Sequence, residues 1–166
     1  MTKKTGSVEH VAFARNYVGG HWVDPSGARL PVFNPATGHQ IAEVGVSTAA
    51  DLVAAVDVAQ AAFLPWRNTP PVERARPLFR FKHLMEAHFE ELAQLVTLDH
   101  GKTLEDARGE VRRAIENVEV ACGIPTLMMG YGLEDGAARG IDEHAIRQPL
   151  GVFAAVVPFK IGRAHV

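Results

Sequence analysis

The chain has 166 residues, of which 47% are hydrophobic and 22% charged, and these are ordinary values for a globular protein. The formal net charge of -2 gives no reason to expect a nucleic acid or an anionic membrane as partner. A single cysteine excludes an internal disulfide framework, and no apolar signal segment follows Met1. We therefore expect a cytoplasmic protein without a membrane span, and the absence of His-x-x-His and Cys-x-x-Cys pairs predicts no metal site.

The first part of the chain is predicted to form strands. Residues 1–15 read as a disordered leader. Two β-type runs then flank Gly19-Gly20, and this pattern predicts a hairpin because tight primed turns need positive φ. A second pair of strands is predicted around Asn34-Pro-Ala-Thr-Gly38, where Asn-Pro and Gly favour a chain reversal.

Four helices are predicted to follow the strands. Thr48-x-x-Asp51 is a variant of the capping box and opens the first helix, which we expect to end at Pro65. Thr69-Pro-Pro71 opens the second, because proline is tolerated in a first turn. Pro77 is costly inside a helix, so it predicts either a kink or a helix that starts near Pro77.

The third and fourth helices have clear signals at their ends. The third carries apolar residues from Glu90 to Asp99 and is expected to stop at Gly101. Thr103-x-x-Asp106 is a capping box that opens the fourth. Beyond it, residues 130–140 are polar and glycine-rich and predict a turn, and residues 141–149 predict an exposed strand.

The carboxyl-terminal residues indicate truncation. Residues 152–157 are apolar at every position, which is typical of a strand buried on both faces of a parallel sheet, and such a strand would have no partners here. Residues 160–166 continue no earlier pattern. Apart from the first base, they back-translate to the start of a widely used short-read sequencing adapter, so we expect this tail to be an artefact.

Few residues indicate chemistry by themselves. The lone Cys122 is predicted to be a small buried hydrophobe rather than a nucleophile. No glycine-rich phosphate loop of the Gly-x-Gly-x-x-Gly or Walker type occurs.

However, four short motifs that follow one another along the chain resemble the N-terminal part of the aldehyde dehydrogenase superfamily. They are Asn34-Pro-Ala-Thr-Gly38, Pro71-x-Glu-Arg-Ala-Arg76, Leu98-Asp-His-Gly-Lys102 and Glu110-Val-x-Arg113. The resemblance covers residues 16–159. Three further segments look like the branch called methylmalonate-semialdehyde dehydrogenase (CoA-acylating), namely Ile115-Glu-Asn-Val-Glu119, the run from Ala121 to Gly130, and Gly140-Ile-Asp-Glu143.

The resemblance implies an α/β fold: the N-terminal part of the aldehyde dehydrogenase fold, truncated. Residues 16–159 would be the first part of the NAD-binding domain, with a β-hairpin arm, helices and the first strand of a parallel Rossmann-like sheet. Strands in residues 16–46 and about 126–149 would form an oligomerisation arm, so the parent protein is expected to be a homodimer or homotetramer.

The resemblance also implies an activity for the parent protein. It would oxidise methylmalonate or malonate semialdehyde to propionyl-CoA or acetyl-CoA, with NAD as cofactor, CoA as co-substrate and a cysteine thioester as intermediate. The nucleophilic cysteine, the glutamate base and the oxyanion asparagine would lie beyond the truncation, and Lys160 stands where the family has that asparagine. The chain alone is therefore expected to be inactive.

Three site residues are carried over by the resemblance. Val157 and Phe159 match a segment that passes the nicotinamide end of the cofactor, and the alternative is that they simply end a core strand. Arg113 matches an arginine near the substrate entrance that could hold the semialdehyde carboxylate. The alternative is a surface arginine paired with Glu110 or Glu116.

Two other functions stay open. One is a semialdehyde dehydrogenase that releases a free acid, for example from succinate semialdehyde, without CoA. The other is a truncated remnant that has no enzyme activity and acts in binding or oligomerisation.

Overall fold

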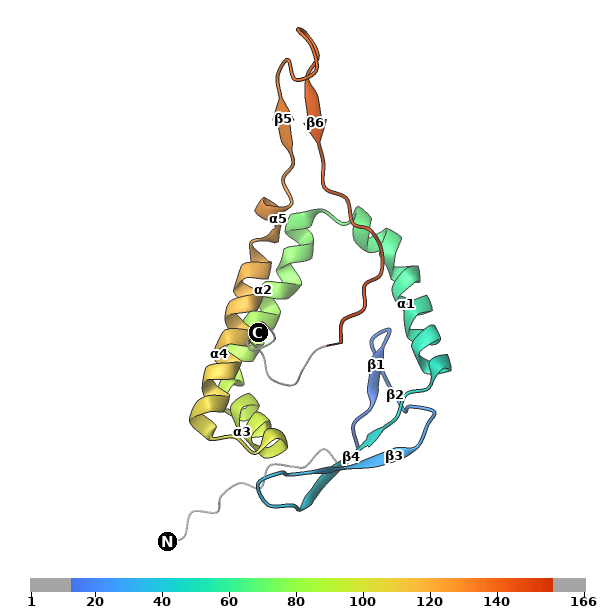
Figure 1. The fold of residues 1–166 in the computed structure, drawn as a ribbon, viewed down its shortest axis with the longest axis vertical. Helices are drawn as coiled ribbons and strands as arrows, with labels where there is room; N and C mark the ends of the chain where they lie inside the picture. Colours follow the sequence, from blue (N-terminus) through green and yellow to red (C-terminus); the bar gives the residue numbers. More distant parts are fainter. Residues whose placement is uncertain (1–12, 157–166) are drawn as a thin grey trace. The chain divides into compact units, whose positions relative to one another are not determined.

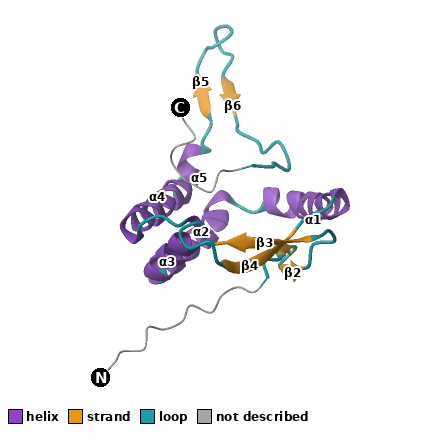
Figure 2. Cartoon of the chain, turned by 60° about the horizontal axis from the view of Figure 1, so that its bottom comes forward, coloured by secondary structure: helices purple, strands orange, loops and turns teal. Residues whose placement is uncertain are grey.

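The computed structural model describes residues 13–156 and contains six short strands and five helices in that range (Figure 1). The chain divides into two compact units. Unit 1 comprises the described part of residues 1–59 together with residues 94–107, and unit 2 comprises residues 60–93 with the described part of residues 108–166. The strands pair as three separate two-stranded sheets, and Figure 2 shows the β5–β6 hairpin clearly.

The first hairpin has the predicted turn. Strands β1 (Asn16–Val18) and β2 (His21–Val23) pair antiparallel, and Gly19 and Gly20 have φ values of 60° and 85°. Positive φ at both central residues is what a primed two-residue turn requires, so the glycine pair explains the hairpin. The Tyr17 and Trp22 rings face each other across it with centroids 4.9 Å apart.

The second hairpin is also confirmed. Strands β3 (Arg29–Phe33) and β4 (Gln40–Gly45) pair antiparallel, and Asn34 begins the turn by accepting the Ala36 backbone N–H through Oδ1 at 2.9 Å. Ala14, which falls at the edge of the expected leader, donates its backbone N–H to Glu43 O at 2.8 Å and bridges Val44. Residues 1–12 lie outside the described residues.

Helix α1 (Ala49–Asn68) begins as predicted but ends later. The Thr48 backbone N–H donates to Asp51 Oδ2 at 2.7 Å, and Thr48 Oγ1 accepts the Asp51 N–H at 3.4 Å. The prediction that Pro65 ends the helix is wrong, because the helix continues through it. One proline inside a helix costs about 3 kcal/mol, which the helix tolerates. Pro70 instead disfavours the helical conformation of Thr69, the residue before it, so the helix ends at Asn68.

Helix α1 is also long and apolar enough to cross a membrane by length and composition alone, and none of it is buried in the described chain. Core helices of soluble proteins pass the same test, so this finding is weak evidence for a membrane span.

Helices α2 (Pro71–Ala87) and α3 (Phe89–His100) follow the predicted starts and stops. Helix α2 begins at Pro71 and carries Pro77 inside it, so the alternative of a start near Pro77 is wrong. The proline at the first helical position fixes φ without removing a helical hydrogen bond and favours the earlier start. Helix α3 ends before Gly101, which has φ of 77° and donates its N–H to Thr97 O at 2.8 Å.

Helix α4 (Leu104–Cys122) contributes most of the buried side chains and is followed by the single turn α5 (Ile124–Leu127). The Thr103–Asp106 capping box forms as predicted, with the Thr103 hydroxyl donating to Asp106 Oδ2 at 2.8 Å and accepting the Asp106 N–H at 3.2 Å. Helices α2 and α4 run side by side in both views (Figures 1 and 2). The buried apolar residues are Ala75, Ala93, Ala107, Val111, Ile115 and Cys122.

The last described segments are only partly as expected. Strands β5 (Tyr131–Leu133) and β6 (Glu143–Ala145) pair antiparallel. Strand β6 lies within the predicted strand 141–149, whereas β5 lies inside residues 130–140, so the predicted turn begins too early. Residues 152–156 do not form the expected buried strand, and Phe153 and Val156 are 76% and 103% exposed. A strand exists only when another backbone pairs with it, and no described segment does so here. Residues 157–166, including the tail expected to be an artefact, lie outside the described residues.

The hydrogen bonds of Asp51 at the start of α1 provide a test of the structure of unit 1. The Ser26 hydroxyl, followed by the Thr48 and Ser26 backbone N–H groups, lowers the pKa of the Asp51 carboxyl far below its ordinary value. A lowered folded-state pKa contributes stability above the unfolded pKa of about 3.9, and this contribution is lost as pH falls further. Asp51→Asn should therefore lower Tm at neutral pH, and the deficit should shrink between about pH 5 and about pH 2.

Asp57→Asn, a change of an exposed carboxylate on the same helix, is the matched control and should leave Tm nearly unchanged. Thermal melts followed by circular dichroism at several pH values measure both variants. A Tm deficit for Asp51→Asn that stays constant across that pH range would contradict the assigned role of the carboxylate.

Candidate functional site

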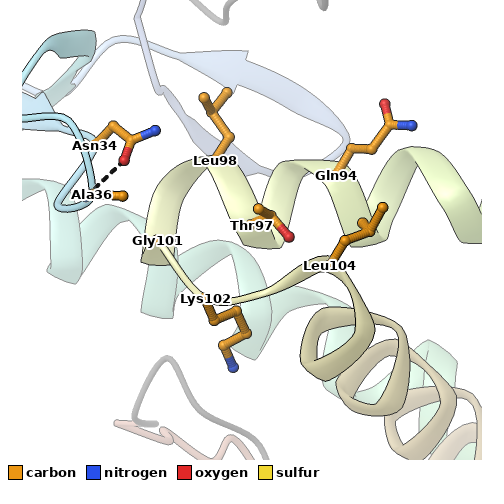
Figure 3. A pocket seen from close by; sticks show the side chains of 8 residues that line it. All are labelled: Asn34, Ala36, Gln94, Thr97, Leu98, Gly101, Lys102 and Leu104. Carbon is orange, nitrogen blue, oxygen red and sulfur yellow. Dashed lines mark hydrogen bonds between the residues drawn. The ribbon is translucent and has the colours of Figure 1, made fainter.

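Two of the four motifs meet in unit 1 and line an open pocket (Figure 3). The β3–β4 turn carries the Asn-Pro-Ala-Thr-Gly motif, and the loop after α3 carries the Asp-His-Gly-Lys motif. The cavity between them, called here the motif pocket, has a volume of about 520 Å³. It is lined from the turn by Asn34 and Ala36, and from helix and loop by Gln94, Thr97, Leu98, Gly101, Lys102 and Leu104.

Gly101 allows this close approach. A Cβ atom at this position would lie 2.9 Å from Pro35 Cγ and 3.2 Å from the Ala36 backbone nitrogen. The φ of 77° also belongs to the left-handed region that side-chain-bearing residues rarely adopt. The same residue therefore ends α3 and makes room for the β3–β4 turn.

The chemistry available in the motif pocket is limited. Its lining is mostly apolar and includes no carboxylate, histidine or cysteine among the described residues. The Thr97 hydroxyl is buried and has no hydrogen-bond partner in residues 13–156. In Figure 3 the Lys102 side chain leaves the loop on the side opposite to Leu98. The motif pocket can therefore hold a mostly apolar group, and its described lining offers hydroxyl, amide and amine side chains but no carboxylate, imidazole or thiol.

Arg113, the substrate residue expected from the resemblance, lies on α4 within unit 2. Val111 and Ile115 on either side of it are buried at 5% and 0% exposure, whereas Arg112 and Arg113 are exposed. An ideal Cβ built on Gly109 would lie 3.7 Å from Arg113 Nη1, so the guanidinium lies along its own helix where glycine leaves space. The Arg112 guanidinium instead lies over the Phe89 ring at 4.9 Å.

Ion pairs hold α4 against its neighbours on the solvent side. Arg108 binds Glu90 of α3 with both ends of the fork, Nε to Oε1 at 2.9 Å and Nη2 to Oε2 at 2.9 Å, and this lowers the pKa of Glu90. Lys82 of α2 contacts Glu119 of α4 at 3.0 Å, and Glu119 followed by Glu86 raises the pKa of Lys82. In each pair the cation is half-buried and the carboxylate is exposed, so solvent screens the attraction and the pairs orient the helices more than they stabilise the fold.

A second pocket, which lies in unit 2, was not predicted from the sequence. Three arginines line it, Arg67 at the end of α1, Arg74 in the first turns of α2, and Arg147 in the segment after β6. We call it the arginine pocket, and its volume is about 490 Å³. Apart from their charge, nothing in the sequence indicates that these three side chains converge, because Arg147 is far from the others along the chain. The rest of the lining comprises amide side chains and the apolar residues Pro71, Pro125, Met128, Met129 and Pro149.

The remaining site predictions have simple outcomes. Val157 and Phe159 lie outside the described residues, so their suggested cofactor contact stays a prediction. No group of three or more potential metal ligands occurs within residues 13–156. Cys122 is 8% exposed at the end of α4, which agrees with a small buried side chain.

The comparison with known proteins defines the class. The sequence matches the Aldehyde dehydrogenase family over residues 22–163, which includes all four motifs. The chain belongs to the aldehyde dehydrogenase family. It resembles the N-terminal part of the family fold. The crystal structure of a Sinorhizobium meliloti 1021 protein described as a methylmalonate-semialdehyde dehydrogenase, in complex with NAD, superposes on this chain with a TM-score of 0.84 at 38% identity. That superposition covers 92% of this chain and 31% of the other.

Within the family, the similar curated proteins are malonate-semialdehyde dehydrogenases. Malonate-semialdehyde dehydrogenase 2 of Geobacillus thermodenitrificans is 53% identical over 147 residues, which is 88% of this chain and 30% of that protein. The Bacillus pumilus malonate-semialdehyde dehydrogenase is 46% identical over 151 residues, or 90% of this chain and 31% of that protein. The chain thus spans about 30% of the length of the curated relatives it matches.

Gly101 provides the test of the motif pocket. Gly101→Ala and Gly38→Ala both place a Cβ at a positive φ, which costs about 1–2 kcal/mol. Only Gly101→Ala also meets Pro35 and Ala36, whereas nothing lies within 4 Å of the position built on Gly38. Urea unfolding should show a clearly larger loss of stability for Gly101→Ala. Equal losses would mean that the two motifs do not pack as described.

Proposed function

We propose that this chain supplies the N-terminal part of an enzyme that oxidises malonate or methylmalonate semialdehyde to acetyl-CoA or propionyl-CoA. The observation that carries the proposal is the 53% identity over 147 residues to a malonate-semialdehyde dehydrogenase. The similarity to a solved relative with bound NAD supports NAD as the cofactor. In this reaction NAD accepts the hydride, CoA accepts the acyl group, and the carboxylate of the semialdehyde leaves as carbon dioxide.

The chemistry requires groups that this part of the protein does not offer. A thiolate must attack the aldehyde, and donors must stabilise the oxyanion that forms. The single cysteine, Cys122, is buried at the end of α4. We therefore place the nucleophile, the base and the oxyanion donor in a part of the enzyme outside these 166 residues.

Arg113 is the residue of this chain that we assign to the substrate. A semialdehyde of this class carries a carboxylate at the end opposite to the aldehyde, and a guanidinium can bind a carboxylate through two parallel hydrogen bonds. Arg113 is exposed on a helix whose other face is buried, so its backbone is fixed and its donors are accessible. This placement supports a role in holding and orienting the substrate carboxylate.

The proposal extends to assembly and location. The four strands from Asn16–Val18 to Gln40–Gly45 and the β5–β6 hairpin form two-stranded sheets with open edges. Open edges present unpaired N–H and C=O groups that another strand can cover. We propose that the intact enzyme is a cytoplasmic homodimer or homotetramer in which these strands act as the arm.

A second function in the same family has one specific observation in its favour. A solved aldehyde dehydrogenase from Physcomitrella patens, in complex with the reaction product succinate, superposes with a TM-score of 0.70 at 29% identity. An enzyme that hydrolyses its thioester to a free acid would share this fold. The difference between the two reactions is whether CoA or water accepts the acyl group.

A chimera separates these functions. Residues 1–159 of this chain, joined to the carboxyl-terminal remainder of the Geobacillus thermodenitrificans relative, should reduce NAD with malonate semialdehyde and form acetyl-CoA. Omitting CoA should slow turnover by about tenfold or more, because the thioester then waits for water. The unjoined chain is the control and should reduce no NAD. Equal rates with and without CoA, and a free acid as product, would favour the second function.

Arg113 is tested in the same chimera. Arg113→Gln should lower kcat/KM for malonate semialdehyde about 10- to 100-fold, since a hydrogen bond to a charged group contributes about 1.5–3 kcal/mol. The rate with propanal, which lacks the carboxylate, should be unchanged. Arg112→Gln removes a neighbouring exposed charge and should leave both rates near those of the parent. A parallel loss with both aldehydes would assign Arg113 to structure rather than to substrate.

A further inference from the structure

We propose that the arginine pocket of unit 2 binds the diphosphate group of a small phosphorylated molecule. The inference is independent of the proposed function, because it depends only on the cavity and on the groups that line it. Arg67, Arg74 and Arg147 bring three guanidinium groups to one cavity from three different elements. Among the described residues, no aspartate or glutamate lines this cavity.

The donors of these arginines are largely unused. Arg74 Nη2 contacts only the Met128 sulfur, a weak acceptor, at 3.9 Å, and its buried Nε has no partner within residues 13–156. Arg67 Nη2 donates to Gln148 Oε1 at 3.4 Å, which is long for an N–H···O hydrogen bond. Arg147 is exposed and also lines the pocket. Guanidinium groups in this state are available for an external oxyanion.

The number of arginines favours phosphate over carboxylate. A carboxylate has two oxygens and is satisfied by one guanidinium fork in the plane of the group. A diphosphate carries several oxygens in tetrahedral arrangements, so it can accept from three guanidinium groups that approach from different elements. Three positive charges also match a polyvalent anion better than a monovalent one.

The size and remaining lining indicate a ligand larger than the anion itself. A volume of about 490 Å³ lies in the usual range for a small-molecule pocket. Met128, Pro125 and Pro149 add apolar surface beside the arginines. The occupant is therefore a diphosphate ester with an apolar or planar portion, and inorganic pyrophosphate is the minimal probe.

Methionine methyl groups locate binding directly. The chain has four methionines, Met1, Met85, Met128 and Met129, so selective ¹³C labelling of their methyl groups gives a spectrum simple enough to assign. Met128 and Met129 line the arginine pocket, whereas Met85 does not. Titration of the 166-residue chain with pyrophosphate at low ionic strength should shift the signals of Met128 and Met129 and leave that of Met85 in place. Citrate at the same concentration should produce smaller shifts.

Matched variants show which charges matter. Arg147→Gln changes a loop residue and should weaken pyrophosphate binding, measured by calorimetry, by about tenfold or more. Arg74→Gln should have an effect of similar size. Arg80→Gln removes an equal charge from the exposed surface of the same helix as Arg74 and should change the affinity little.

Three results would overturn the proposal. The first is a folded chain, with helical circular dichroism, whose Met128 and Met129 signals do not respond to pyrophosphate. The second is an equal loss of affinity in Arg80→Gln and Arg147→Gln, because this would indicate non-specific attraction to a basic surface. The third is citrate binding that is tighter than pyrophosphate binding.

Discussion

The contact between Gly101 and the β3–β4 turn is the constraint on which unit 1 depends. A residue without Cβ is required there twice, once because φ is 77° and once because Pro35 and Ala36 occupy the space beside it. The glycine ends α3, and the capping box at Thr103 then starts α4 after a very short connection. The glycine thus fixes the end of α3 and the position of the β3–β4 turn, and the Thr103 cap fixes the start of α4.

Helix α4 carries Arg113, the residue proposed to bind substrate. Its start is set by the Thr103 cap, and its buried face is set by Val111 and Ile115. The Arg108–Glu90 pair and the Lys82–Glu119 pair then restrict its rotation from the solvent side. Arg113 therefore projects from a helix with a defined rotation, which is the condition for a guanidinium to orient a carboxylate.

Local signals could be predicted from the sequence, and non-local ones could not. The glycine pair of the first hairpin and both capping boxes act within a few residues, so their geometry follows from residue type. The predicted helix end at Pro65 and the alternative helix start near Pro77 are wrong, because each proline carries a local cost that the rest of its helix outweighs. The 152–156 strand needs a partner, and the two pockets need residues distant in sequence, such as Asn34 with Leu98. None of these depends on neighbouring residue types alone.

The two arginine sites of unit 2 differ in what each can recognise. Arg113 is a single exposed guanidinium next to Arg112, which is also exposed. One guanidinium of this kind suits the reversible binding of one carboxylate. The arginine pocket instead gathers three guanidinium groups with few internal partners, and like charges held together in this way repel one another. A bound anion of matching charge would relieve that repulsion. A carboxylate substrate would therefore favour Arg113, and a diphosphate would favour the arginine pocket, although both ligands are anions.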